Sequence, residues 1–177
     1  MLRLFIWLIL FAFAEGYDQT QLNMNAKVFE KILLLDANLG EKSTKNGGIG
    51  ITIVYDEAEL LDAQRLQRFL ETTAVEGNFP HPLTVKLARY GDFKNQRADA
   101  YFLLDSPDAA QVRAVAAHAI ANGIITFSFN YSYLEHGVML SLRIDQKVYP
   151  VLNPEAIRES RINFKPILIR IAKQYNR

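Results

Sequence analysis

Cysteine is absent from all 177 residues of the chain. This absence excludes disulfide bonds, thiolate catalysis, cysteine-ligated zinc and a lipid anchor on an N-terminal cysteine. A charge excess of one sign is also lacking, because 20 Lys and Arg stand against 19 Asp and Glu. Nucleic-acid binding depends on neutralising phosphates with a basic surface, so the balanced charge argues against nucleic acid as a partner.

The sequence also lacks the motifs of common enzyme and metal sites. There is no Gly-x-Ser-x-Gly nucleophile elbow and no Ser-x-x-Lys pair. The glycines within residues 47–50 precede a predicted strand, whereas a phosphate-binding loop follows one. His81, His118 and His136 have no metal-ligand spacing, and we expect His118 on the solvated side of a helix. We therefore predict no catalytic residue, no metal, no cofactor and no enzymatic activity.

The first residues have the pattern of a secretory signal peptide. Arg3 is followed by an apolar run over residues 4–11 and by the small-residue pattern Ala12-Phe13-Ala14. A membrane-spanning helix needs roughly 20 apolar residues, and this run is shorter. The alternatives are a short uncleaved anchor and a buried helix. We predict a signal peptide over residues 1–14 and a single domain over residues 15–177.

The remaining sequence alternates between strand-like and helix-like segments. Helices are predicted over residues 26–39, 57–72 and 108–122, and strands over residues 49–55, 83–87, 100–104 and 124–129. The polar stretch of residues 40–48 is predicted to be a loop. Such alternation favours a mainly parallel sheet with helices on both faces.

The C-terminal part predicts a hairpin and a last helix. Residues 138–144 and 147–152 are the two strands of the hairpin, and Pro150 places the second strand at a sheet edge. Apolar residues at helical spacing over 164–175 predict an amphipathic helix with Pro166 in its first turn. The predicted fold class is therefore α/β, a three-layer sandwich with a mainly parallel mixed sheet, a C-terminal β-hairpin and a closing helix.

Two carboxylates follow predicted strands and are candidates for a cation or ligand site. Asp56 and Asp105 would converge at the carboxyl edge of a parallel sheet. Helix capping is the simpler interpretation, because Asp56 and Glu59 have the spacing of a capping box. Similarly, Ser106-Pro107-Asp108 supplies a cap, a proline at the first helical position and an acid in the first turn.

One segment alternates aromatic and small polar residues through and beyond a predicted strand. If it stays extended, Phe127, Phe129, Tyr131 and Tyr133 point to one side. This side is either buried under a helix or forms an aromatic contact surface, since such rings are enriched at protein interfaces. The four residues are our candidate partner-binding site.

The C-terminal half resembles a known family. The matching segments are Gly137-Val138-Met139-Leu140-Ser141-Leu142-Arg143, Asn153-Pro154-Glu155-Ala156 and Phe164-Lys165-Pro166-Ile167-Leu168-Ile169-Arg170-Ile171-Ala172. They are similar to the end of the YfiR-like family of bacterial periplasmic proteins, which has a glycine-led strand, a strand closing on Asn-x-x-Ala and a Leu-rich helix. The resemblance implies a periplasmic α/β domain that acts by binding another envelope protein, as the namesake restrains a membrane-bound diguanylate cyclase in cyclic di-GMP signalling.

Two classes of function follow from these observations. The leading prediction is a non-catalytic periplasmic interaction module that regulates or scaffolds a membrane-associated complex. Its partner would be an inner-membrane signalling protein or a component of a flagellar motor or secretion assembly, with a homo-oligomer also open. The alternative is a periplasmic small-ligand-binding receptor domain, because the carboxyl edge of a parallel sheet is a natural place for a pocket.

Overall fold

The computed structural model describes residues 19–145 and 147–176, so the predicted signal peptide lies outside the described residues. Its centre is one sheet in the order β2-β1-β3-β4-β5-β6-β7. The strands are β1 (Ile49–Tyr55), β2 (Leu83–Arg89), β3 (Ala100–Leu103), β4 (Ile125–Ser128), β5 (Leu140–Ile144), β6 (Val148–Leu152) and β7 (Lys173–Gln174). The first five strands in this order pair in parallel, β6 is antiparallel to β5, and β7 is parallel to β6.

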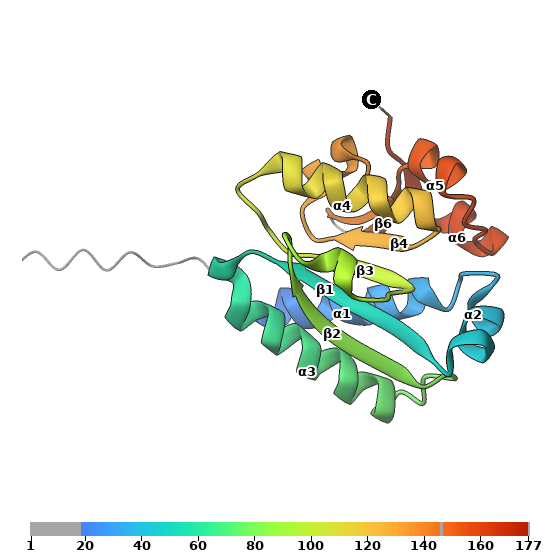
Figure 1. The fold of residues 1–177 in the computed structure, drawn as a ribbon. Helices are drawn as coiled ribbons and strands as arrows, with labels where there is room; N and C mark the ends of the chain where they lie inside the picture. The colour runs from blue at the N-terminus through green and yellow to red at the C-terminus, as the bar shows by residue number, and fades with distance from the viewer. Residues whose placement is uncertain (1–18, 146, 177) are drawn as a thin grey trace, which may run out of the picture.

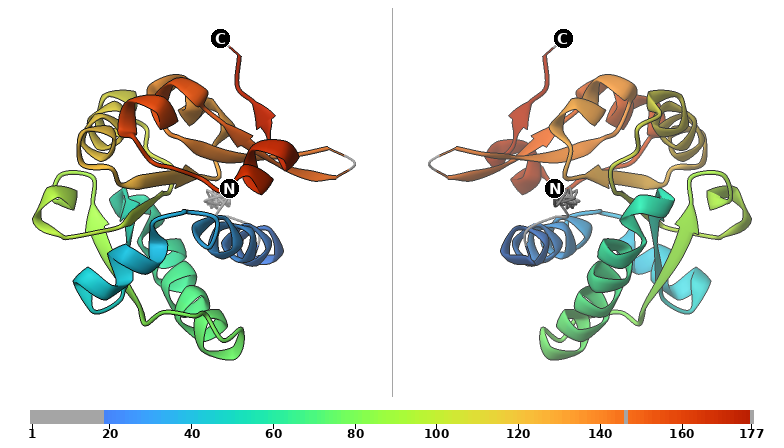
Figure 2. Two further views of the ribbon diagram at one scale, coloured as in Figure 1. Left: turned by 90° about the vertical axis from the view of Figure 1, so that its right-hand side faces the viewer. Right: turned by 90° about the vertical axis from the view of Figure 1, so that its left-hand side faces the viewer.

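Helices cover both faces of the sheet, as Figures 1 and 2 show. The α-helices are α1 (Gln19–Leu33), α2 (Leu39–Asn46), α3 (Leu60–Glu76), α4 (Ala109–Asn122), α5 (Pro154–Ser160) and α6 (Pro166–Ile171). The short 3-10 helices of the described residues are η1 (Glu57–Glu59), η2 (Phe93–Asn95) and η3 (Tyr131–His136). Helices α1 and α3 lie side by side on one face and α4 on the other. This arrangement confirms the predicted fold class, a three-layer α/β sandwich with a mainly parallel mixed sheet.

The core on the α1 side is aromatic. Phe29 of α1 packs against Phe102 of β3 and Phe127 of β4, with ring centroids 4.9 and 5.0 Å apart, and all three side chains are fully buried. Aromatic side chains bury a large apolar area and favour such edge-to-face and tilted contacts. The strands are thereby fixed to α1 in the middle of the sheet.

The predicted first helix and the loop after it are both placed differently in the structure. Helix α1 ends at Leu33, and part of the predicted loop is α2. Buried Asp36 explains the break, because it accepts a hydrogen bond from the Asn38 backbone N–H at 2.9 Å and pairs with Lys42 at 2.7 Å. Gly47, at a φ of 71°, ends α2 in the left-handed conformation typical of helix ends.

The C-terminus also differs from the prediction. The hairpin of β5 and β6 is confirmed, but the closing helix is only α6, and α5 precedes it. After Ile171 the chain is extended because Lys173 pairs with Val151 of β6, and the Tyr175 N–H donates to the Leu152 carbonyl at 2.7 Å. Strand β6, which contains Pro150, is therefore not the edge strand that was predicted. Pro150 itself precedes the residues of β6 that pair with β7.

The other end of the sheet is the outer side of β2. Two glutamine amides reach carbonyl groups of this strand: Gln67 of α3 donates to Val85 at 2.9 Å, and Gln96 donates to Leu87 at 3.3 Å. Residues 85 and 87 are two apart and therefore direct their carbonyls to the same side of the strand. The two side chains thus cover acceptors that could otherwise pair with a strand of another molecule.

Candidate functional site

The strand order defines where the sheet reverses its direction of winding. The chain passes from β1 outward to β2 and then returns to the other side of β1 as β3. In open α/β sheets, ligands bind outside the carboxyl ends of the strands at such a switch point. Here the switch point lies between the carboxyl ends of β1 and β3. Asp56 directly follows β1, and Asp105 follows β3 after Leu104. Both carboxylates are half-buried.

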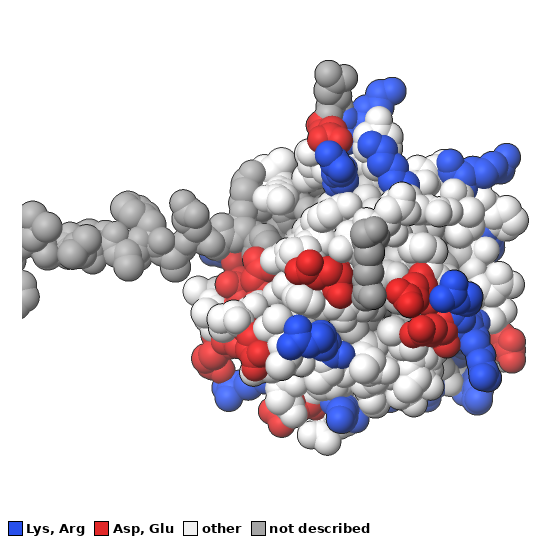
Figure 3. All heavy atoms as spheres, turned by 90° about the horizontal axis from the view of Figure 1, so that it is seen from above, with Lys and Arg blue, Asp and Glu red and all other residues white. Residues whose placement is uncertain are grey.

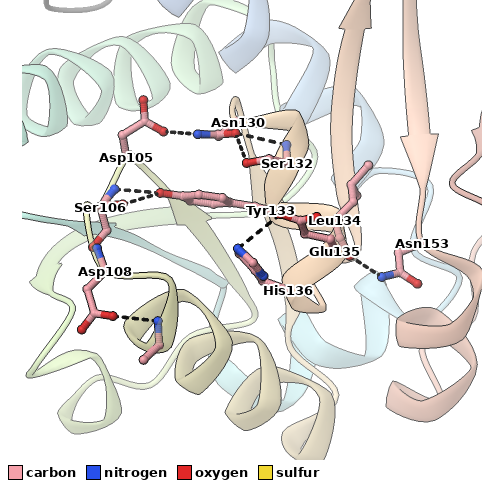
Figure 4. A network of polar contacts seen from close by, with 11 residues as sticks. Asp105, Ser106, Asp108, Asn130, Ser132, Tyr133, Leu134, Glu135, His136 and Asn153 are labelled. Atoms are coloured by element: carbon pink, nitrogen blue, oxygen red, sulfur yellow. Dashed lines mark hydrogen bonds and ion pairs between the residues drawn. The ribbon is translucent and has the colours of Figure 1, made fainter. Parts of the chain in front are cut away.

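A polar network joins the ends of β3 and β4 beside this point (Figure 4). The Asn130 Nδ2 donates to Asp105 Oδ1 at 2.9 Å. The Asn130 Oδ1 accepts from the backbone N–H of Ser132 at 3.1 Å and from the Ser132 Oγ at 2.6 Å. Asn130 thereby fixes the orientation of Asp105 and also caps η3. The carboxylate is held in place by a residue 25 positions away in the sequence.

Two buried tyrosines hold the same edge together. The Tyr133 hydroxyl accepts a hydrogen bond from the Ser106 N–H at 2.7 Å and lies 3.2 Å from the Ser106 carbonyl oxygen (Figure 4). Tyr90 directly follows β2, and its hydroxyl donates to the Leu104 carbonyl at 2.6 Å. Burial is the main cause that raises the pKa of both phenols, so they stay neutral at ordinary pH.

The electrostatic character of the edge is acidic. Burial is the largest cause that raises the pKa of the Glu59 carboxyl above its ordinary value. Neighbouring negative charges raise it further, and they belong to Asp62, Asp105 and Asp56. A positively charged group or a donor-rich molecule would therefore be favoured next to Glu59.

The predicted capping roles are only partly correct. The Asp56 side chain makes no capping hydrogen bond, because the Glu59 N–H bonds to the backbone carbonyl of Asp56 at 2.8 Å instead. The cap of α4 is Asp108 and not Ser106, since Asp108 Oδ1 accepts from the Ala110 N–H at 2.8 Å. Asp105 is bonded to Asn130 instead, and the Ser106 backbone is bonded to the Tyr133 hydroxyl.

The four aromatic candidates do not share one exposed side. The segment leaves the extended conformation at η3, so the expected alternation is lost. Phe127 is fully buried under α1, and Phe129 is half-buried against Phe102, with centroids 4.7 Å apart. Tyr133 is 5% exposed and Tyr131 is 39% exposed. The alternative of burial under a helix is confirmed for Phe127, and a partner-binding role of the four residues stays a prediction.

The histidines lie apart from this edge or at its margin. We expected His118 to be solvated, but it is half-buried and packs against Phe93 and Tyr101, at centroid distances of 5.3 and 6.2 Å. Burial, followed by the charge of Lys94, lowers its pKa. His136 lies at the end of η3 with its Nε2 3.6 Å from Glu135 Oε1. Within residues 19–145 and 147–176 no three histidine or carboxylate side chains are placed to hold a metal ion.

Tyr90, Asn130 and the role of Tyr133 at this edge were not predicted from the sequence. The only local signal was Asn130 two residues before Ser132, the spacing of an Asx turn.

The surface above the sheet, seen in Figure 3, carries side chains of both charges rather than a continuous region of one sign. In the part of the chain that the structure describes, no helix has the length and apolar character required to cross a membrane.

No family model and no curated protein matches this sequence. Solved structures do match its fold. The ABC domain from Streptococcus pneumonia in complex with L-Trp has a TM-score of 0.60 and 11% identity, over 87% of this chain and 60% of that chain. A conserved domain protein from Vibrio cholerae has a TM-score of 0.60 and 15% identity, over 88% and 60%.

A third match is a substrate-binding protein with adhesive properties from Clostridium difficile, in its ligand-free, open structure. It has a TM-score of 0.58 and 11% identity, over 83% of this chain and 59% of that chain. The chain thus spans about 60% of the length of the structures it matches. At these identities the likeness establishes the fold.

The comparisons correct the leading functional prediction. One matching structure holds L-Trp and another is a substrate-binding protein, whereas we expected a protein-interaction module for an envelope complex. The interaction module is therefore the wrong prediction, and its alternative, small-ligand binding, is better supported. The resemblance to the YfiR-like family stays a prediction.

Proposed function

We propose that this chain is a binding domain for a small polar molecule held at the carboxyl edge of its sheet. The observation that carries the proposal is the Asp105–Asn130 pair, with its 2.9 Å hydrogen bond, beside the switch point between β1 and β3. The pair orients a carboxylate at the position where open α/β sheets receive ligands. The binding proteins of similar fold support the same class of function.

The acidic edge favours a ligand with hydrogen-bond donors, such as an ammonium group. Asp56, Glu59 and Asp105 supply acceptors, and the pKa of Glu59 is raised first by burial and then by the neighbouring carboxylates. We infer that the domain binds without catalysis. We also infer that residues 1–14 direct its export to the periplasm, where a receptor for an external solute would act.

Calorimetric titration of the full chain tests the binding. L-tryptophan is the first probe because a matching structure contains it, followed by the other proteinogenic amino acids. Asp105→Asn keeps an oxygen for Asn130 but removes the charge, and we expect it to weaken binding by about tenfold, roughly 1.4 kcal/mol. Asp92→Asn is the matched control, since Asp92 is exposed and its side chain does not cap η2.

Two outcomes would contradict the proposal. One is that no compound of the series binds the wild-type chain. The other is that Asp105→Asn and Asp92→Asn bind the same compound with the same affinity as the wild type.

Mass spectrometry of the protein from its native cell envelope tests the export, and retention of residues 1–14 would contradict cleavage.

A further inference from the structure

A cavity of about 440 Å³ lies at the opposite end of the molecule from the carboxyl edge. It is formed where α1 and α3 end. Helix α3 runs from the carboxyl end of β1 to the amino end of β2, so its C-terminus lies at the amino end of the sheet. Figure 1 shows both helices on the same face of the sheet. Its lining is Lys27, Glu30, Lys31, Leu34, Thr73, Glu76, Gly77, Asn78, Phe79 and Pro80. The volume lies in the range of small-molecule sites.

One part of the lining is apolar and held in place. Leu34 and Phe79 are half-buried, and Pro80 follows Phe79 at the mouth. The Phe79 N–H donates to the Ala74 carbonyl at 2.9 Å, which fixes the turn after α3. An apolar group between Leu34 and Phe79 would remove both side chains from water.

A half-buried carboxylate lies beside this apolar part. The Thr73 Oγ1 is 2.5 Å from Glu30 Oε1 and donates to it when the carboxyl is ionised. Burial raises the pKa of Glu30, and the Thr73 hydrogen bond and the charge of Lys27 offset it only in part. The charge of Glu30 is therefore incompletely stabilised. A cation at this position gains from Glu30 and from the negative end of the α3 dipole.

Positive charges lie on the α1 side of the mouth. Lys27 and Lys31 are one helical turn apart and both are exposed. The Lys27 Nζ lies 5.9 Å from the centroid of the Phe69 ring, so its side chain leans across toward α3. The two ammonium groups can receive a carboxylate at the mouth while a cation occupies the interior.

We propose that this cavity binds an α-amino acid with an apolar side chain, as a second site independent of the ligand site at the carboxyl edge. The ammonium group lies against Glu30, the apolar side chain between Leu34 and Phe79, and the carboxylate near Lys31. The two lysines and two glutamates of the lining have no net charge, which matches a zwitterion better than an ion of either sign.

Amide NMR spectra of the isotope-labelled full chain test the site, with L-phenylalanine as the probe. We expect saturable shifts at residues 27–34 and 73–80. Phenethylamine lacks the carboxylate and hydrocinnamate lacks the ammonium group. Each should bind about tenfold more weakly, a loss of roughly 1.4 kcal/mol.

Glu30→Gln keeps an acceptor for Thr73 and should weaken L-phenylalanine binding by about tenfold, while the matched control Glu41→Gln, at an exposed position of α2, should not. Lys31→Gln, at an exposed position, provides the same test if Glu30→Gln fails to fold, and should reduce the preference for L-phenylalanine over phenethylamine.

The absence of shifts at residues 27–34 and 73–80, or an unchanged affinity in both cavity variants, would overturn the second site. Shifts confined to residues 105–106 and 130–134 would also overturn it and would support the carboxyl-edge site instead. Loss of binding in Glu30→Gln but not in Asp105→Asn would support the second site alone.

Discussion

Replacement of Tyr133 by phenylalanine tests whether its hydroxyl holds the carboxyl edge together. The variant keeps the ring, which is 5% exposed, and removes only the oxygen that lies 2.7 Å from the Ser106 N–H. A net hydrogen bond contributes about 0.5–1.5 kcal/mol, and a buried donor left without a partner costs about 1–3 kcal/mol. Ser106 is half-buried, so water can satisfy part of the lost bond. We therefore expect a loss of about 1–2 kcal/mol in the free energy of unfolding.

Urea unfolding followed by circular dichroism measures this loss. For a chain of this length, 1–2 kcal/mol corresponds to a fall in Tm of about 2–8 °C. Tyr131→Phe is the control, because Tyr131 is 39% exposed and its ring contact with Tyr175, at 6.0 Å, does not need the hydroxyl. A surface change of this kind is expected to stay within about 0.5 kcal/mol. Equal stability of the two variants would refute the role of Tyr133.

Three further perturbations follow from particular contacts. Burial raises the pKa of Tyr90, so its neutral form stabilises the fold fully below about pH 10, the unfolded value, and this contribution is lost as the pH rises further. The melting temperature should fall above that pH, and a flat profile would contradict the burial. Gly48→Ala should cost about 1–3 kcal/mol in a urea titration, because φ is 146° and the new Cβ would lie 2.7 Å from a carbonyl oxygen. Gly40→Ala, with open space around it in α2, should be neutral or stabilising, and equal effects would contradict the steric argument. The double variant Gln67→Ala with Gln96→Ala uncovers the outer carbonyls of β2 and should increase self-association in analytical ultracentrifugation, whereas unchanged sedimentation would refute their protective role.

The elements that the sequence predicted well carry their signals locally. Strand β1 consists mostly of β-branched residues, and its bounds are those predicted. Helix α4 has an acidic cap at Asp108 and ends at Gly123, whose φ of 64° is the left-handed value that glycine adopts easily. Apolar spacing and end signals therefore suffice where one segment determines its own structure.

The errors arise where a distant residue decides. Helix α2 is polar and was expected to be a loop, but it buries Leu39 and Ser43 and is tied to Asp36 by Lys42. The helical spacing over residues 164–175 is interrupted because the backbone from Lys173 pairs with β6 instead. In both places local propensity is overridden by contacts that no local pattern reveals.

The candidate site was predictable only in its location. Asp56 and Asp105 follow strands, so their presence at one sheet edge follows from the parallel order. The hydrogen bond from Asn130 to Asp105 joins residues that the sequence separates by 25 positions, and no spacing rule predicts it.

The aromatic segment connects the core of the protein to this site. Phe127 is anchored under α1, and six residues later Tyr133 holds the end of β3 through Ser106. Asn130, between them, is therefore fixed on both sides when it orients Asp105. A binding site requires such support, because a loosely held carboxylate must lose conformational entropy when a ligand binds. On this reasoning, Tyr133→Phe should weaken ligand binding at the carboxyl edge more than its effect on overall stability implies, and should leave the cavity between α1 and α3 unchanged.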